Sequence, residues 1–174
     1  SSVRLRLNIQ KEKFISFTQV GSEKVNLTNH TKTKFDILVI GRFLTIKSFD
    51  LAINSFADFL NKLEAKDKVY LTIVGRGPKG KELKTLVSRL KIEEKVKFID
   101  WIDKKDLATI YQNSSLFFFP SHEGAGMVTV EALSYGLPVL CFNNYGGGEL
   151  VDETCGVRIE YSTYLQSVKD FSNA

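Results

Sequence analysis

From residue 36 onward, short apolar runs alternate with stretches of helical periodicity. The apolar runs predict strands over residues 36–41, 69–75, 96–100, 115–120, 138–142 and 156–160. The periodic stretches predict helices over residues 48–63, 79–90, 104–112, 127–135 and 163–171. Nearly continuous apolar strands that alternate with helices are typical of a parallel sheet covered on both faces. We therefore predict an α/β fold: a Rossmann-like, doubly wound parallel sheet of about six strands with right-handed crossovers.

The length of the chain, 174 residues, fits a single domain of this kind. Residues 1–35 do not share the alternation, and their polar part, 21–34, reads as a linker. We predict an N-terminal segment or linker over 1–35, and we keep open that it is a remnant of an interdomain region. The folded domain is then 36–174. Because the last predicted helix ends close to the end of the chain, we expect a piece of a longer protein.

Charge and cysteine content limit the partners and the compartment. The chain carries 24 basic and 20 acidic residues, a net charge of +4, with no run of five Lys or Arg, so a nucleic-acid partner is not expected. Cys141 and Cys155 lack a metal or redox spacing, and Cys141 lies in an apolar strand, which indicates a reduced setting. No apolar run approaches the ~20 residues that span a bilayer. We predict a cytoplasmic protein, and peripheral attachment of the full-length protein at the inner face of the membrane stays open.

The strongest site signal is a pair of glutamates, Glu123 and Glu131, on either side of a glycine-bearing run. The run follows the predicted strand 115–120 and leads into the predicted helix 127–135. Open α/β sheets bind ligands at the carboxyl ends of their strands. Glycines let the backbone approach a ligand, and the start of a helix presents N–H groups to an anion. A phosphate over such amides, beside carboxylates that accept sugar hydroxyls, predicts a nucleotide-sugar site.

Two cations follow the first predicted strand. Arg42 offers a planar fork of donors and Lys47 a compact charge, so a loop between them can aim both at one diphosphate. Taken alone, both could be solvated loop charges. The chain has no pair of aspartates one residue apart, and Asp103 to Asp106 read as a helix start with Asp103 as N-cap. We therefore expect no metal and no cofactor, with the cations stabilising the diphosphate as it leaves.

A second glycine motif supports a different class of protein. The run Gly75-Arg76-Gly77-Pro78-Lys79-Gly80 matches the dinucleotide-binding fingerprint, and Asp100 occupies the place of a ribose-binding acid. The main alternative is therefore an NAD(P)-binding Rossmann domain of an oxidoreductase that uses Gly75, Gly77 and Gly80. Pro78 removes an N–H group from the turn, and this alternative gives the cations and glutamates no task. A third hypothesis is a non-catalytic module that binds sugar nucleotides or polyanions.

The order of these motifs resembles the donor-binding, C-terminal domain of GT-B fold glycosyltransferases, specifically glycosyltransferase family 4 (glycosyl transferases group 1). The resemblance covers residues 36 to 160. It rests on five blocks of residues, 40–47, 74–78, 96–101, 120–131 and 132–139, and on a weaker sixth block at 146–151.

The resemblance implies a retaining, metal-independent hexosyltransferase. It would move a sugar from a UDP- or GDP-type nucleotide sugar to a glycan or lipid-linked acceptor. The family binds its acceptor through an N-terminal domain that has no counterpart in this chain. The isolated domain is therefore expected to bind a nucleoside diphosphate sugar and to transfer nothing efficiently.

The resemblance also assigns roles residue by residue. Arg42 and Lys47 would hold the donor diphosphate and stabilise it as it departs, and Glu123 would orient hydroxyls of the transferred sugar. These three are the catalytic candidates, and none is assigned as a nucleophile. Glu131 would hydrogen-bond the ribose. His122, beside Glu123, is a weaker candidate for contact with phosphate or sugar.

The remaining predicted donor contacts come from backbone and packing. They are the amides of Gly124, Ala125 and Gly126 along the sugar and phosphate, the turn at Gly75 and Gly77 beside the nucleotide, and Trp101 and Ile102 at the base.

Overall fold

The computed structural model describes residues 32–122, 126–144 and 146–174. It contains a six-stranded, all-parallel sheet in the order β3-β2-β1-β4-β5-β6. The strands are β1 (Phe35–Ile40), β2 (Val69–Val74), β3 (Val96–Ile99), β4 (Leu116–Phe119), β5 (Val139–Phe142) and β6 (Gly156–Ile159). This is the doubly wound, Rossmann-like α/β fold predicted from the sequence, and its strand order reverses between β1 and β4.

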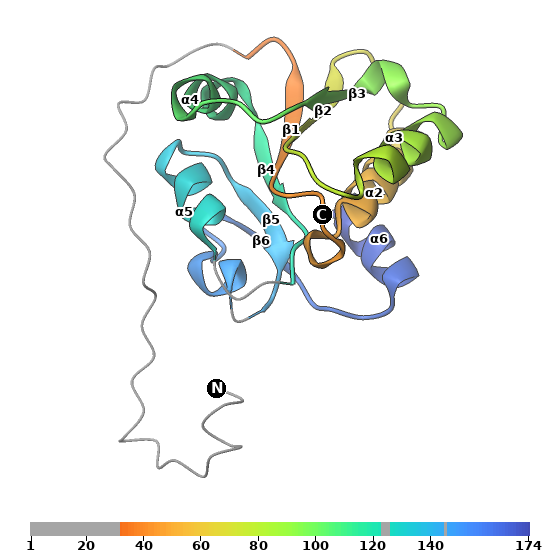
Figure 1. The fold of residues 1–174 in the computed structure, drawn as a ribbon. Coiled ribbons are helices and arrows are strands. Elements are labelled where there is room, and N and C mark those ends of the chain that lie inside the picture. The colour runs from red at the N-terminus through yellow and green to blue at the C-terminus, as the bar shows by residue number, and fades with distance from the viewer. Residues whose placement is uncertain (1–31, 123–125, 145) are drawn as a thin grey trace, which may run out of the picture.

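Helices cover both faces of the sheet. They are α2 (Phe49–Lys62), α3 (Gly80–Arg89), α4 (Lys104–Asn113), α5 (Met127–Ser134) and α6 (Tyr164–Asn173), with short 3-10 turns η2 (Thr45–Lys47), η3 (Glu93–Lys95) and η4 (Gly147–Leu150). In Figure 1, α4 and α5 lie on one side of the sheet and α2, α3 and α6 on the other. Each predicted strand and helix is confirmed, with bounds that move by a residue or two.

Strand β1 shows why the fold is doubly covered. Ile37 and Val39 belong to the buried cluster formed with α2, α3 and α6, whereas Leu38 belongs to the cluster formed with α4 and α5. Successive side chains of a strand point to opposite faces, so an apolar strand needs a helix layer on each side. The continuous apolar run of β1 therefore fits a strand that is buried between two layers of helices.

Two local predictions have different outcomes. Cys141 is buried in β5 as predicted, and this burial raises the pKa of its thiol to about 11. Asp103 occupies the N-cap position of α4 with an extended backbone, but its side chain accepts no capping hydrogen bond. Thr163 does cap α6, because its hydroxyl accepts the N–H of Gln166 at 3.2 Å. Asp103 therefore marks its helix start by position and charge alone.

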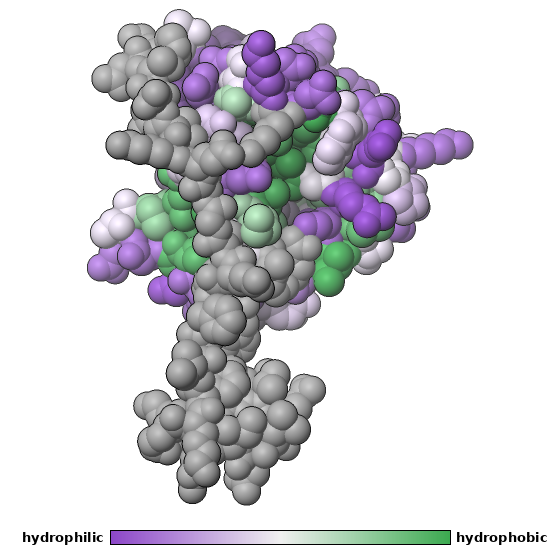
Figure 2. Space-filling model, turned by 60° about the vertical axis from the view of Figure 1, so that its left-hand side comes forward, coloured by the Kyte–Doolittle hydropathy of each residue, from purple (hydrophilic) through white to green (hydrophobic). Residues whose placement is uncertain are grey.

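Hydrophilic residues cover much of the coloured part of the face seen in Figure 2, and hydrophobic residues show between them.

In the part of the chain that the structure describes, no helix combines the length and the apolar character needed to cross a bilayer. The predicted N-terminal segment, 1–35, falls almost wholly outside the described residues.

Candidate functional site

A cavity of about 950 Å³ opens at the carboxyl edge of the sheet, where the strand order reverses. It is formed by the segments that follow β1, β2 and β3 and by α5. The predicted site residues that line it are Arg42, Lys47, Gly75, Gly77, Trp101, Ile102 and Glu131. Residues from four separate parts of the sequence therefore meet in one cavity.

The other predicted residues fall outside this set. Glu123, Gly124 and Ala125 lie outside the described residues. Gly126 is the N-cap of α5 and does not line the cavity. It is buried against η4, where an added Cβ would lie 2.8 Å from the Cα of Gly147. In the structure, Gly126 thus allows the close approach of two backbone segments.

The two cations are placed by the segment between β1 and α2. Arg42 is exposed directly after β1, and Lys47 ends η2. The carbonyl of Ile46 accepts the N–H of His122 at 3.1 Å, which ties η2 to the segment that leaves β4. The Lys47 ammonium lies 5.9 Å from the centroid of the Phe119 ring. Both cations therefore border the cavity from a segment that is fixed at each end.

Glu131 enters the cavity from α5. Its side chain is partly buried, and the hydroxyl of Tyr111 donates a hydrogen bond to its Oε2 at 3.1 Å. Tyr111 belongs to α4 and is 2% exposed. The sequence analysis did not single out this tyrosine, because neither its spacing nor its neighbours mark a site.

The turn at Gly75 and Gly77 packs against the segment that carries Arg42. An added Cβ on Gly75 would lie 1.9 Å from the carbonyl oxygen of Gly41, and one on Gly77 would lie 2.8 Å from the nitrogen of Phe43. The N–H of Phe43 donates to the carbonyl of Arg76 at 3.0 Å. These glycines therefore let two loop backbones touch beside the cavity.

The same turn has few amides left for a pyrophosphate. The N–H of Gly75 donates to Ile99, that of Lys79 to Phe43 and that of Gly80 to Gly77. Pro78 has no N–H group. A dinucleotide fold needs its glycine turn to present amides to the pyrophosphate. The hydrogen bonding of this turn disfavours the dinucleotide alternative.

Trp101 lies at the rim of the cavity with 68% of its surface exposed. The guanidinium of Arg76 lies 6.0 Å from the centroid of its indole ring. The carboxylate of Asp100 accepts the N–H of Trp101 at 2.7 Å, which fixes the start of this segment. Arg76 also lines the cavity, but the sequence analysis gave it no role. Its position between Gly75 and Gly77, which were predicted to lie beside the nucleotide, could have marked it as a site residue.

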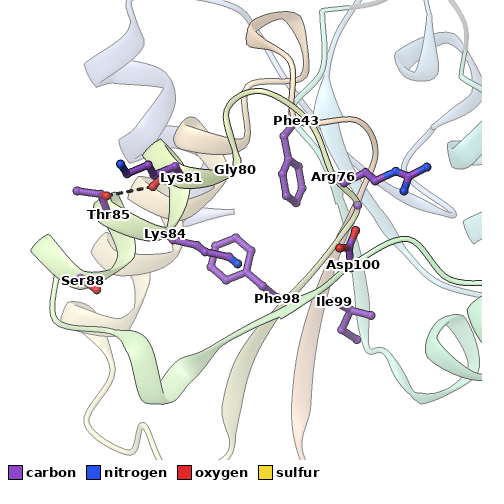
Figure 3. A pocket seen from close by; sticks show the side chains of 12 residues that line it. Phe43, Arg76, Gly80, Lys81, Lys84, Thr85, Ser88, Phe98, Ile99 and Asp100 are labelled. Carbon is purple, nitrogen blue, oxygen red and sulfur yellow. Dashed lines mark hydrogen bonds between the residues drawn. The ribbon is translucent and has the colours of Figure 1, made fainter.

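A second cavity of about 750 Å³ lies on the α3 side of the glycine turn (Figure 3). Lys84 reaches over Phe98, with its ammonium 5.8 Å from the ring centroid, and the guanidinium of Arg76 points away from α3. Asp100, the ribose-binding acid of the dinucleotide alternative, lines this second cavity, whereas Arg42 and Glu131 line the first. Gly75 and Gly77 line both cavities, so the two hypotheses differ in space only at Asp100 and Gly80 on one side and at Arg42, Lys47 and Glu131 on the other.

His122 is held by aromatic rings. Its imidazole stacks on Phe142 at a centroid distance of 4.7 Å and meets Tyr161 edge-on at 5.0 Å. The loss of water on these sides lowers the pKa of His122, although much of the residue stays exposed. The predicted contact with phosphate or sugar has no observation in its favour beyond its place in sequence.

This pKa shift predicts a small loss of stability in acid. Below pH ~6.5 the unfolded chain takes up a proton on this histidine more readily than the folded chain does, so the free energy of unfolding falls until the folded pKa is passed. In the variant His122→Phe, which keeps an aromatic ring, we expect melting temperatures to fall less between pH 7.5 and pH 5.5. Thermal unfolding followed by circular dichroism measures this. Equal pH dependence in both proteins would contradict the assignment.

Among the described residues, no three or more His, Cys, Asp or Glu side chains gather closely enough to hold a metal ion.

The fold and the cavity define a class of protein, and sequence comparison names it. The family described as "Glycosyl transferases group 1" matches residues 22–161, most of the chain. The chain belongs to this family. Membership supports the glycosyltransferase prediction and gives no support to the oxidoreductase alternative.

Individual relatives and solved structures agree with this assignment. Alpha-1,3/1,6-mannosyltransferase ALG2 of Dictyostelium discoideum is 31% identical over an alignment 169 residues long, gaps included, which covers 86% of this chain and 39% of the relative. A variant of S. aureus TarM, solved in complex with fondaparinux, alpha-GlcNAc-glycerol and UDP, superposes with a TM-score of 0.80 at 21% identity, covering 99% of this chain and 35% of that one. The C-terminal domain of a glycosyl transferase group 1 family protein (LpcC) of Francisella tularensis gives a TM-score of 0.69 at 22% identity, covering 82% of this chain and 75% of that one.

The fold is that of the C-terminal half of a GT-B glycosyltransferase. The chain spans between a quarter and two fifths of the length of the curated relatives it matches.

Proposed function

We propose that this chain is the donor-binding domain of a retaining, metal-independent glycosyltransferase. The full-length protein would transfer a hexose from a UDP- or GDP-type nucleotide sugar to a glycan or lipid-linked acceptor. One observation carries this proposal: Arg42, Lys47 and Glu131, from distant parts of the sequence, line one cavity at the carboxyl edge of the sheet. Cations suit a diphosphate and a carboxylate suits ribose hydroxyls, so the chemistry of the lining fits a nucleoside diphosphate.

The cations have the central chemical role in this proposal. Departure of a nucleoside diphosphate leaves negative charge on its phosphate oxygens, and fixed positive charge lowers the energy of the transition state. Arg42 and Lys47 would supply that charge without a metal ion and without a cofactor. Because Arg42 is rigidly forked and Lys47 is a compact charge, the two can contact different oxygens of one diphosphate.

The nucleoside would extend from the diphosphate toward β3. Glu131 would accept hydrogen bonds from the ribose hydroxyls, and the base would lie at Trp101 and Ile102, which line the same cavity. Binding of UDP in the complex of TarM supports this class of ligand. Glu123, Gly124 and Ala125 keep their predicted roles, Glu123 toward the transferred sugar and the two amides toward sugar and phosphate, whereas Gly126 lies outside the cavity and is given no contact with the donor.

The remaining partners follow from the share of the relatives that this chain covers. The acceptor would be bound by the part of the protein that corresponds to the rest of those relatives, so the isolated chain is expected to bind donor and to be inactive in transfer. Names of relatives such as ALG2 mannosyltransferase support glycan biosynthesis as the setting. We propose a cytoplasmic location for the protein.

A calorimetric titration of the chain with UDP, GDP, ADP and NAD⁺ tests this proposal. We expect saturable binding of one nucleoside diphosphate in the presence of EDTA, with a Kd that changes by no more than about twofold when Mg²⁺ replaces EDTA, because the site supplies its own positive charge. NAD⁺ at the same concentrations is the control ligand. Binding of NAD⁺ alone would move the protein to the dinucleotide-binding class, and binding that requires Mg²⁺ would overturn the metal-independent mechanism.

A further inference from the structure

The buried hydroxyl of Tyr111 is the direct partner of Glu131, and it comes from a different helix. The hydroxyl donates to Oε2 of Glu131 at 3.1 Å across the contact between α4 and α5. Tyr111 does not line the cavity, whereas Glu131 does. The tyrosine can therefore act on a ligand only through the carboxylate.

The ring of Tyr111 has little freedom to turn. It stacks on Tyr135 at a centroid distance of 4.9 Å and an interplanar angle of 9°, and it packs against Phe117 at 6.3 Å. Only 2% of the residue is exposed. Protein interiors are packed as densely as organic crystals, so a ring enclosed in this way holds its hydroxyl at one place.

Tyr111 also remains a donor throughout the pH range in which the protein would work. Burial and the neighbouring carboxylate raise the pKa of its hydroxyl far above the ordinary value. An ionised carboxylate can only accept hydrogen bonds, so the direction of this bond is fixed. A hydrogen bond to a charged group is stronger than one between neutral groups.

We propose that Tyr111 is a positioning residue that holds Oε2 of Glu131 so that Oε1 faces the ribose hydroxyls of the bound nucleotide. This inference rests on the proposed function, because it assigns Glu131 to the ribose. A glutamate side chain has several rotatable bonds, and ordering it costs free energy at the moment of binding. Holding the carboxylate in place before the ligand arrives removes part of that cost and increases affinity.

The test compares the chain with its Tyr111→Phe variant, which keeps the ring and removes the hydroxyl. The probes are UDP and GDP, each beside its 2′,3′-dideoxy form, which lacks both ribose hydroxyls. For the unmodified chain we expect the dideoxy form to bind at least about tenfold more weakly. In Tyr111→Phe we expect the Kd of the ribose form to rise by roughly 3- to 30-fold while the Kd of the dideoxy form stays unchanged.

The matched control is Tyr135→Phe, which keeps the stacked pair of rings. It should leave the ratio of the two Kd values unchanged. In a Glu131→Ala background, which removes the acceptor of the Tyr111 hydroxyl, Tyr111→Phe should have no further effect on the ratio. The test stays valid if Tyr111→Phe alone lowers stability. A loss of folded protein weakens the apparent binding of both ligands equally, so the ratio of their Kd values does not change.

The outcomes separate the two proposals. An unchanged ratio in Tyr111→Phe would overturn the positioning role and leave the proposed function intact. Equal binding of the ribose and dideoxy forms by the unmodified chain would overturn the assignment of Glu131 to the ribose, and with it this inference. Binding of neither UDP nor GDP would overturn the UDP- or GDP-type donor together with this inference.

Discussion

Replacing Arg42 by alanine is expected to weaken nucleoside diphosphate binding by roughly 1–3 kcal/mol, about 5- to 150-fold in Kd. Arg42 lies directly after β1 and lines the cavity together with Lys47 and Glu131. Its exposed guanidinium can give a diphosphate two parallel hydrogen bonds, which are lost in the variant. Isothermal calorimetry measures the change.

Arg89→Ala is the matched control for this variant. Arg89 ends α3, and it does not line the cavity. It removes the same charge from the chain, so a general loss of electrostatic attraction would appear equally in both variants. Normal affinity in Arg42→Ala, combined with loss of binding when Asp100 is replaced by alanine, would contradict the assignment of the site.

The largest expected loss of stability comes from Gly75→Ala. The backbone of Gly75 has φ +141°, which side-chain-bearing residues rarely adopt, and an added Cβ would lie 1.9 Å from the carbonyl oxygen of Gly41. Neither backbone can move freely, because the N–H of Gly75 donates to Ile99 and that of Gly41 to Val74. Strain and overpacking together should cost about 3 kcal/mol or more, a fall in melting temperature of roughly 10 °C.

Gly80→Ala in the same motif serves as the comparison. Gly80 is the first residue of α3, and its added Cβ would meet only the edge of the Phe43 ring, at 3.3 Å and beyond, and no backbone atom outside its own helix. Alanine also favours a helix, so the change in unfolding free energy should stay within about 1 kcal/mol. Thermal unfolding of both variants gives the comparison. A stable Gly75→Ala protein that has lost ligand binding would instead favour a direct role of the turn in holding a pyrophosphate.

Much of the fold could be predicted because its signals are local. The run 116–119 is apolar throughout, and other apolar runs alternate with stretches of helical periodicity, so strands and helices could be located to within a residue or two. Strand order was not predicted, because it depends on which distant strands pair. Asp103 was correctly predicted as the N-cap residue of α4, but residue type and position do not determine whether its side chain makes the capping hydrogen bond, and in the structure it does not.

The candidate site, too, could be predicted where its signals are local and could not be predicted where they depend on packing. Arg42, Lys47 and Glu131 stand at the ends of predicted strands or in the following helix, where topology brings ligand-binding groups together. Tyr111 could not be predicted, since its role depends on the packing of α4 against α5. At the glycine turn, the sequence suggested a function that the local structure explains in another way. Its residues matched a phosphate-binding pattern, yet in the structure Gly75 and Gly77 allow the close approach of two backbone segments.

A crystal structure of this chain with the nucleoside diphosphate that binds it best would test the central claim most directly. We expect the diphosphate between Arg42 and Lys47, the ribose hydroxyls within hydrogen-bond distance of Glu131, and the base beside Trp101 and Ile102. A nucleotide held instead in the second cavity, with its phosphates on the turn at Gly75 and Gly77 and its ribose on Asp100, would contradict the account.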